Sequence, residues 1–391
     1  MSRIERREFF RTGTAAVLLP SALISPAINQ PHGSGSNQQS NGDQVRMSGD
    51  GLGLDAQQLS RVWMELADEG KILPDSYSNG GSVEILEDEF ARILGKERAV
   101  FMPTGTLANH LAVRALSTGS GRVVVQHESH LYNDSGDCVQ NLSRLNLIPL
   151  AQGRSTFTLD ELQEAVERSK RGRVATPITV ISIESPVRRR YGESFDENEL
   201  MDIVEFARGR NIRLHLDGAR LFLQSAYTGR SVSDYASLFD TVYISLYKYF
   251  NAPSGAILAG PSHLLDEMFH ARRMFGGGLP AAWPFTSIAT RYLAGFTERF
   301  KDAISVSESL IKRLQEHDSF QIQRRTSGTN LFTLRMLGQE PGRFLRSLEA
   351  QGINGVRRFR EPNEFLLSVN ETWNRIDADT LAGRFVTAWE G

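Results

Sequence analysis

Residues 241–255 read Thr-Val-Tyr-Ile-Ser-Leu-Tyr-Lys-Tyr-Phe-Asn-Ala-Pro-Ser-Gly. The first six are mostly β-branched or aromatic, which predicts a buried β-strand. Lys248 follows that strand among aromatic neighbours. Burial lowers the pKa of a lysine ammonium and leaves a nucleophilic amine, so Lys248 is a candidate for covalent catalysis. The alternative interpretation is a lysine whose amine reaches the surface from a strand end.

Four segments upstream share this β-rich composition and alternate with helical patterns. They cover residues 98–102, 122–126, 178–183 and 212–216. One helical pattern begins at Asp196, with Glu199 at the spacing of a capping box. Strands that alternate with helices predict an α/β fold with a mainly parallel central sheet. Ligands of such sheets bind beyond the carboxyl ends of the strands, so the residues after each strand are the first candidates for a site.

Polar residues follow three of these strands. Gly105 and Thr106 open a helical pattern, where free N–H groups and the helix dipole bind phosphate, although threonine there is also an ordinary helix cap. His130 follows the second strand and is suited to stack on a ring, to move protons or only to cap a turn. Asp217 follows the fourth strand, where a buried carboxylate needs a cationic partner, either Arg220 or a ligand.

Together with Lys248, these residues match the functional groups of pyridoxal phosphate (PLP). The phosphate, ring face, ring nitrogen and aldehyde of PLP each need one protein partner. The partners expected, in that order, are Gly105 with Thr106, His130, Asp217 and Lys248. Each feature alone is a weak signal, but their coincidence at strand ends predicts a PLP site.

The composition of the 391-residue chain excludes several other classes of protein. Its 44 basic and 46 acidic residues give a formal charge of −2, with no electrostatic footprint for nucleic acid or a membrane surface. The single cysteine, Cys138, excludes an intramolecular disulfide and a cysteine-rich metal site, and we expect no bound metal. Only six lysines are present, so few amines are available for covalent chemistry.

The N-terminal region differs in composition from the rest. Arg6-Arg7 precede two phenylalanines and a short apolar stretch, a pattern typical of a twin-arginine signal peptide with cleavage near Ala27. The alternatives are a chance arginine pair before a tail and an uncleaved membrane anchor. We expect a signal peptide over 1–27, a disordered linker over 28–46, export to the periplasm, and no stable membrane span after cleavage.

Two folded parts are expected after the linker. Residues 47–296 form the large PLP-binding domain together with an N-terminal segment. Residues 297–391 read as long helices with a few strands, which predicts a smaller second domain.

Several motifs resemble the low-specificity L-threonine aldolases of the β-eliminating lyase group. They lie at residues 95–109, 128–132, 217–222, 245–260 and 272–278. The resemblance extends in consistent order from about residue 75 to residue 279. It implies the PLP-dependent fold type I, which is aspartate-aminotransferase-like, with a mainly parallel central sheet and a smaller C-terminal α+β domain.

The resemblance also implies roles on the cofactor side. Lys248 would carry the cofactor covalently, and Asp217 would keep its pyridine nitrogen protonated. His130 would stack on the ring, and it is our candidate for the catalytic base. Gly105 and Thr106 would bind the phosphate.

On the substrate side, the resemblance assigns contacts to three residues. Arg220 would bind the substrate carboxylate, Tyr77 matches a tyrosine near the cofactor, and Ser48 weakly resembles a serine that touches substrate. Proteins of this family are dimers or tetramers whose sites borrow residues across the subunit interface. We therefore expect a homodimer or homotetramer.

The sequence departs from the family pattern mainly on the substrate side of the site. Leu279-Pro280-Ala281 stand where the family commonly has Met-Arg-Gln, which removes an arginine expected near the cofactor. Glu184-Ser185-Pro186 replace the usual Glu-Asn-Thr. Residues 364–368 stand where the family tends to have an arginine for the substrate carboxylate. The nearby arginines that could substitute are Arg357, Arg358 and Arg360.

The expected function is an aldolase that cleaves the Cα–Cβ bond of β-hydroxy-α-amino acids, such as L-threonine or L-allo-threonine, to glycine and an aldehyde. The partner is then a small amino-acid substrate, not a nucleic acid. One alternative is another PLP-dependent amino-acid lyase, acting by β-elimination, or a racemase. The other is an exported protein that keeps the fold without turnover.

Overall fold

The computed structural model describes residues 43–117 and 121–391. The expected signal peptide over 1–27 and the linker as far as residue 42 lie outside the described residues. Residues 43–46 correct the expected end of the linker, because Val45–Arg46 form strand β1, which pairs in parallel with β11 (Ile353–Asn354). Val45 is fully buried. Because its neighbours in the sequence are polar, the composition of this stretch did not predict that burial.

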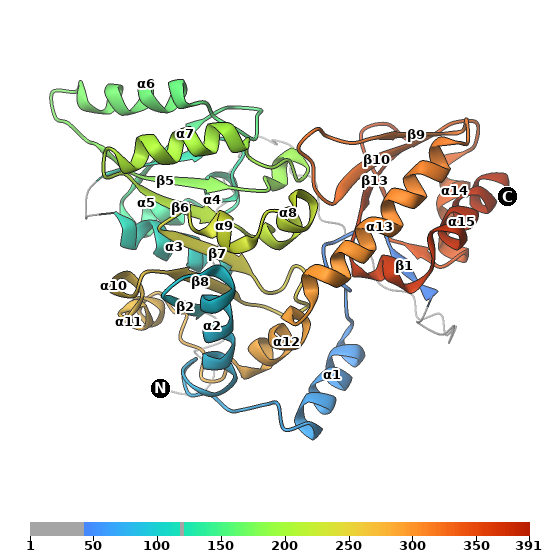
Figure 1. Ribbon diagram of the computed structural model, residues 1–391, viewed down its shortest axis with the longest axis horizontal. Helices are drawn as coiled ribbons and strands as arrows, with labels where there is room; N and C mark the ends of the chain where they lie inside the picture. The colour runs from blue at the N-terminus through green and yellow to red at the C-terminus, as the bar shows by residue number, and fades with distance from the viewer. Residues whose placement is uncertain (1–42, 118–120) are drawn as a thin grey trace, which may run out of the picture. The chain divides into compact units, whose positions relative to one another are not determined.

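A seven-stranded sheet forms the centre of the larger domain, in the order β2-β8-β7-β6-β5-β3-β4 (Figure 1). Its strands are β2 (Arg98–Met102), β3 (Arg122–Gln126), β4 (Asn146–Leu150), β5 (Ile178–Glu184), β6 (Arg213–Asp217), β7 (Thr241–Ser245) and β8 (Ala256–Gly260). Strands β3 to β7 are parallel, and β8 runs antiparallel to both of its neighbours. The mainly parallel sheet is thereby confirmed.

The five strands expected from the sequence are all present, and their ends differ from the prediction by at most one residue. Strands β4 and β8 were not predicted. Pro149 weakens the β-pattern of β4, but β4 is an edge strand, where proline is tolerated. Strand β8 consists largely of alanine and glycine, which have low strand propensity, and it is held between β7 and β2.

Helices cover both faces of this sheet (Figure 1). Val124 of β3 packs in the same apolar cluster as Ile203, whereas its neighbours Val123 and Val125 pack with Val113 on the opposite face. The helices of this part are α1 (Ala56–Asp68), α2 (Gly81–Leu94), α3 (Gly105–Leu116), α4 (His130–Asn133), α5 (Cys138–Ser143), α6 (Leu159–Lys170), α7 (Glu197–Arg208), α8 (Leu221–Thr228), α9 (Val232–Ala236), α10 (Ser262–Leu265), α11 (Met268–Met274) and α12 (Trp283–Leu293).

Helix α7 begins where the sequence predicts, with one difference. Asp196 is the N-cap, and its side chain accepts hydrogen bonds from the backbone N–H groups of Asn198 and Glu199. The Glu199 carboxylate does not complete the expected capping box. It accepts a hydrogen bond from the backbone N–H of Leu159 at 2.8 Å and so joins α7 to the start of α6.

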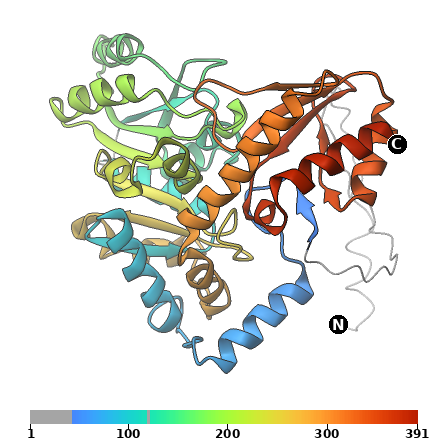
Figure 2. The same ribbon diagram turned by 45° about the vertical axis from the view of Figure 1, so that its right-hand side comes forward.

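The smaller domain has a four-stranded antiparallel sheet in the order β12-β13-β10-β9. Its elements are α13 (Phe296–Gln315), β9 (Phe320–Gln323), β10 (Leu331–Met336), α14 (Pro341–Ala350), β12 (Arg357–Arg358), β13 (Glu364–Ser368), the 3₁₀ helix η3 (Glu371–Arg375) and α15 (Ala378–Glu390). Helix α13 packs against α8 of the larger domain and against α15 and η3 of the smaller one (Figure 2). Among the described residues, no helix is both long and apolar enough to span a bilayer.

Candidate active site

The carboxyl ends of the parallel strands surround one cavity of about 340 Å³. Lys248 follows β7, Asp217 ends β6, Glu184 ends β5, and His130 opens α4 after β3. All four line the cavity, together with Gly49, Asp50, Arg188, Ala219, Arg220, Tyr243 and Tyr247. The structure therefore brings together Lys248, His130, Asp217 and Arg220 of the residues singled out in the sequence.

Asp217 is held by a buried chain of hydrogen bonds. The Asn109 amide donates from Nδ2 to Asp217 Oδ2 at 2.7 Å, and Asn109 Oδ1 lies 2.8 Å from His215 Nε2. The other imidazole nitrogen of His215 lies 2.9 Å from the Thr241 hydroxyl. Because Asn109 donates to Asp217, its oxygen must accept from His215, and the Thr241 hydroxyl then donates to His215 Nδ1.

Burial lowers the pKa of His215 to about 4, against the opposing effect of Asp217. The imidazole is therefore neutral at physiological pH, as this donor and acceptor order requires. Neither His215 nor Asn109 was anticipated from the sequence. His215 could have been found from the sequence. Residues two apart on a strand point to the same face of the sheet, so His215 is expected on the same face as Asp217.

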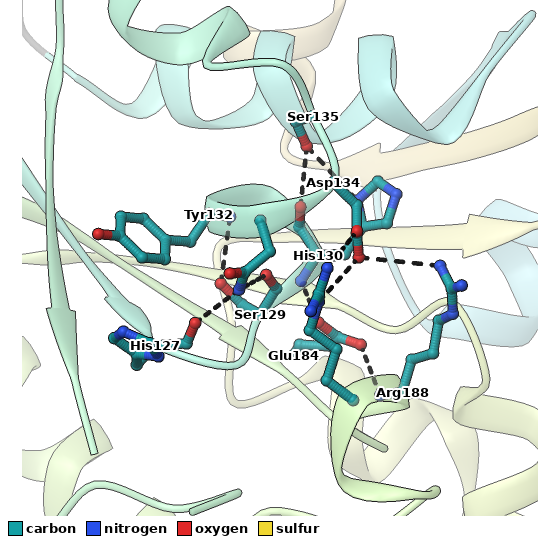
Figure 3. A network of polar contacts seen from close by, with 10 residues as sticks. His127, Ser129, His130, Tyr132, Asp134, Ser135, Glu184 and Arg188 are labelled. Atoms are coloured by element: carbon teal, nitrogen blue, oxygen red, sulfur yellow. Dashed lines mark hydrogen bonds and ion pairs between the residues drawn. The ribbon is translucent and has the colours of Figure 1, made fainter. Parts of the chain in front are cut away.

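Glu184 joins the two segments that carry His130 and Arg188 (Figure 3). Its buried carboxylate accepts hydrogen bonds from the backbone N–H of His130 at 2.6 Å and from that of Arg188 at 2.9 Å. Burial and the nearby Asp217 raise the pKa of Glu184, and the two backbone donors act against that rise. Glu184 was noted in the sequence only as part of an altered motif, although it occupies the same strand-end position as Asp217.

The Lys248 side chain lies between two tyrosines. Its Nζ atom is 4.9 Å from the ring centroid of Tyr247 and 5.9 Å from that of Tyr243. Nζ makes no hydrogen bond to any described residue, so its amine is free to react. A Cβ atom at Gly51 would come within 2.6 Å of the Lys248 carbonyl oxygen, so only glycine allows the N-terminal segment to pass this close.

The N-terminus of α3 lies behind Tyr243, outside the lining of the cavity. Thr104 caps the helix by accepting a hydrogen bond from the Leu107 N–H, whereas the N–H groups of Gly105 and Thr106 have no acceptor among the described residues. A Cβ atom at Gly105 would overlap the Tyr243 hydroxyl group. The predicted phosphate donors therefore lie next to the phenol ring of Tyr243, the same ring whose centroid is 5.9 Å from Lys248 Nζ.

Arg220 is held by a carboxylate from the N-terminal segment. Its Nε donates to Asp50 Oδ2 at 2.8 Å, and Asn330 Nδ2 donates to Asp50 Oδ1 at 3.0 Å. Both charged side chains are largely buried, with exposed fractions of 16% for Arg220 and 10% for Asp50. Neither Asp50 nor Asn330 was anticipated from the sequence.

The remaining predicted substrate contacts lie elsewhere in this chain. Ser48 is buried beside Gly355 and does not line the cavity, although its neighbour Gly49 does. Tyr77 is 44% exposed, and its ring lies under the Arg273 guanidinium at 4.4 Å. In one copy of the chain, these two residues are therefore not brought to the cavity.

The three C-terminal arginines do not line the cavity that contains Lys248. Arg357 and Arg358 are exposed on β12. Arg360 lines a separate cavity, where it lies near the rings of Tyr191 and Phe359. Within one copy of the chain, none of these three candidates for the substrate-side arginine therefore lies in the cavity lining.

Residues 70–336 match the family described as beta-eliminating lyase. The chain belongs to this family. Among the beta-eliminating lyases and their relatives, a low-specificity L-threonine aldolase from Candida albicans is 31% identical over 207 residues, which is 52% of this chain and 54% of the relative. The alanine racemase TOXG from Cochliobolus carbonum is 30% identical over 210 residues, which is 53% of each chain.

The matched part spans about half the length of these two curated relatives. A solved structure from Exiguobacterium sp. 255-15 covers more of the molecule. It is assigned to the aromatic amino acid beta-eliminating lyases and threonine aldolases, and it has a TM-score of 0.74 at 28% identity. The alignment covers 89% of this chain and 98% of that one. The fold is that of PLP-dependent fold type I enzymes, as expected.

Proposed function

We propose that this beta-eliminating lyase is a PLP-dependent aldolase that cleaves the Cα–Cβ bond of β-hydroxy-α-amino acids to glycine and an aldehyde. One observation carries the proposal: Lys248, Asp217 and His130 line a single cavity at the carboxyl ends of the parallel strands β7, β6 and β3. Arg220 lines the same cavity and supplies a guanidinium for the carboxylate of an amino acid. The L-threonine aldolase relative supports this choice of substrate class.

The residues present fit PLP. Asp217 is a buried carboxylate that suits a protonated ring nitrogen, and the unpaired N–H groups of Gly105 and Thr106 suit a phosphate. The amine of Lys248 has no other partner among the described residues and suits the aldehyde. When bound, this cofactor supplies an electron-withdrawing ring that stabilises negative charge developing at Cα.

The chain's own groups position the substrate and move one proton. Arg220 binds the α-carboxylate and orients the substrate in the cavity. His130 accepts the proton of the β-hydroxyl group as the general base. Ser135 Oγ lies 3.5 Å from His130 Nδ1, which leaves Nε2 as the nitrogen for this proton. Glu184 fixes the segment that carries His130 through the backbone.

The test is to incubate the cofactor-loaded protein with L-threonine and to measure glycine and acetaldehyde. We expect the two products in equal amounts. Lys248→Ala should abolish them together with the visible absorption of the bound cofactor, whereas Lys170→Ala, on an exposed stretch of α6, should change neither. A coloured protein that releases no glycine from L-threonine or L-allo-threonine would contradict the proposal.

A second candidate function is amino-acid racemisation, because the alanine racemase TOXG is almost as similar to this chain as the aldolase. The same purified protein incubated with L-alanine would then produce D-alanine. β-Elimination would instead release ammonia from a substrate with a leaving group at Cβ. A protein that binds the cofactor without turnover would give none of these products.

We also propose a homodimer or homotetramer in which Tyr77 serves the site of a neighbouring copy. Its side chain is exposed and is not part of the lining of its own cavity, which supports this assignment. Exposed apolar side chains lie on the same part of the chain at Met64, Leu73 and Ile85. Light scattering of the purified protein tests the assembly, and a monomer with full activity would contradict it.

We further propose export by the twin-arginine route, supported by the Arg6-Arg7 pair and the short apolar stretch after it. A protein loaded with its cofactor before transport suits a route that carries folded chains. Replacing both arginines by lysine should retain the protein in the cytoplasm, as measured by cell fractionation. Equal periplasmic amounts of both forms would contradict the proposal.

A further inference from the structure

The cavity contains a second arginine that the proposed reaction does not use. Arg188 opens the 3₁₀ helix η2 (Arg188–Arg190), which follows β5. Its backbone N–H is fixed by Glu184, and its side chain lines the cavity with 60% of its surface exposed. Figure 3 shows the Arg188 side chain rising toward Asp134, beside His130. Arg188 is thus fixed at its backbone, and its exposed guanidinium reaches as far as an ion pair with Asp134.

The charge of Arg188 is only weakly neutralised by the protein, through one ion pair among the described residues. The nearest carboxylate is Asp134, with 3.8 Å between Arg188 Nη1 and Asp134 Oδ2. Both Asp134 oxygens already accept hydrogen bonds from Arg189, at 2.7 and 3.2 Å. Arg190, the third arginine of η2, is paired with Glu193. Arg188 itself donates no side-chain hydrogen bond to any described residue.

The other carboxylates of the cavity are also engaged. Asp217 accepts from Asn109, and Glu184 accepts from two backbone N–H groups. Asp50 accepts from Arg220 and Asn330. A cavity of about 340 Å³ is therefore lined by two guanidinium groups, and the α-carboxylate of an amino acid needs only one of them.

We propose that Arg188 binds a carboxylate on the side chain of the substrate. The preferred substrate is then a β-hydroxy-α-amino acid with a second carboxylate at its distal end, such as 3-hydroxyaspartate. The fork of a guanidinium matches the two oxygens of a carboxylate, and Arg188, whose side chain has only the 3.8 Å ion pair with Asp134, loses no side-chain hydrogen bond when it binds one. This inference rests on the proposed function, because it extends the same site.

The reaction of such a substrate balances in the same way as that of threonine. The Cα–Cβ bond breaks, the β-hydroxyl group loses its proton to His130, and that oxygen becomes the carbonyl of the aldehyde. A proton is added at Cα to give glycine. The second product is an aldehyde that carries the distal carboxylate, and Arg188 holds that group throughout.

A binding experiment tests the inference without turnover. Titration calorimetry of the cofactor-loaded protein compares L-aspartate with L-2-aminobutyrate, neither of which has a β-hydroxyl group to be cleaved. We expect L-aspartate to bind about tenfold more tightly, in line with a charge-assisted bidentate pair. Arg188→Met should abolish the difference, and Arg188→Lys should keep only part of it. Arg190→Gln removes the same charge from η2, outside the cavity, and should change nothing.

Steady-state kinetics supply the second measurement. We expect kcat/KM for 3-hydroxyaspartate to exceed that for L-threonine, with this advantage lost through KM in Arg188→Met. Equal binding of the two calorimetric ligands by the natural protein overturns the inference, even if L-threonine is cleaved. A preference for L-aspartate that Arg188→Met loses supports it, and the absence of glycine release would then overturn only the proposed aldolase.

Discussion

The two halves of the cavity differ in how their charged groups are held. On the cofactor half, Asp217 ends a chain of buried partners that runs through Asn109 and His215 to Thr241. On the substrate half, Arg220 depends on Asp50, which comes from the N-terminal segment, and the side chain of Arg188 makes no hydrogen bond to a described residue. The polar groups of the cofactor half are hydrogen-bonded to one another, whereas the substrate half keeps guanidinium N–H donors for a ligand.

This difference follows from what each half must do. A group that stabilises charge in the same place at every turnover acts best when it is fixed in advance by buried hydrogen bonds. A group that binds and releases a substrate must have donors free at some stage of the cycle, because a donor already bound to protein gains little from a new acceptor. The predictions below test this contrast.

The largest effect is expected on the cofactor half. Asp217→Asn keeps the shape and the contact with Asn109 but removes the negative charge. We expect kcat for L-threonine to fall on the order of 10²–10³-fold, with KM changed far less. An unchanged kcat would mean that the charge at this position does not assist the reaction.

On the substrate half, Asp50→Asn should act first on stability. It leaves the guanidinium of Arg220 largely buried without its carboxylate, at a cost of about 3 kcal/mol in the free energy of unfolding. A bound amino acid supplies the missing carboxylate, so L-alanine should raise Tm more in this variant than in the natural protein. Thermal unfolding with and without L-alanine measures both effects, and an equal rise in Tm would contradict the contrast.

A smaller effect should follow from shortening the buried chain behind Asp217. Asn109→Ala leaves Asp217 and His215 each without one partner, which should cost about 1–3 kcal/mol of stability. We expect kcat to fall about tenfold with little change in KM. Asn141→Ala, at an exposed position, is the matched control, and equal kinetics of the two variants would show that the chain does not position Asp217.

A half-buried carboxylate that does not line the cavity, Glu87, shows how partial burial shifts a pKa. Burial raises the pKa of Glu87 from 4.5 to about 7, although its side chain accepts a hydrogen bond from the Phe101 N–H at 2.7 Å. The folded protein therefore holds this proton more tightly than the unfolded chain does. The resulting stabilisation is complete below about pH 4.5 and is lost as pH rises towards 7.

Glu87→Gln removes that titration. Between pH 5 and pH 8, the natural protein should lose about 1–3 kcal/mol of unfolding free energy relative to the variant. Glu84→Gln, at an exposed position of the same helix, should behave like the natural protein. Parallel pH profiles for all three proteins would contradict the shifted pKa.

The central sheet could be predicted because its strands are short, apolar and rich in β-branched residues, so each strand is identified by its own composition. Lys248, Asp217 and His130 were found by a rule that also needs only local information, namely that polar residues follow strands. Their roles on the cofactor remain predictions. The same rule, applied to the end of β5, would have selected Glu184 as well.

The partners of these residues could not be found in this way. Asn109 and Asp217 are 108 residues apart, and Asp50 and Arg220 are 170 apart. Such pairs are set by how α3 and the N-terminal segment pack on the sheet, and no local pattern records that packing. The position of Arg360 in a separate cavity illustrates the same limit, because its distance from the site depends on the tertiary structure of the smaller domain.

The pairing of β1 with β11 means that the smaller domain is assembled from both ends of the chain. Val45 pairs with Ile353, and the Met47 carbonyl accepts a hydrogen bond from the Ser368 N–H. The Asp50 carboxylate accepts a hydrogen bond from the side-chain amide of Asn330. During synthesis, the N-terminal segment therefore leaves the ribosome about 280 residues before its partners exist. The wall of the cavity that contains Asp50 is thus among the first parts to be made and among the last to be completed.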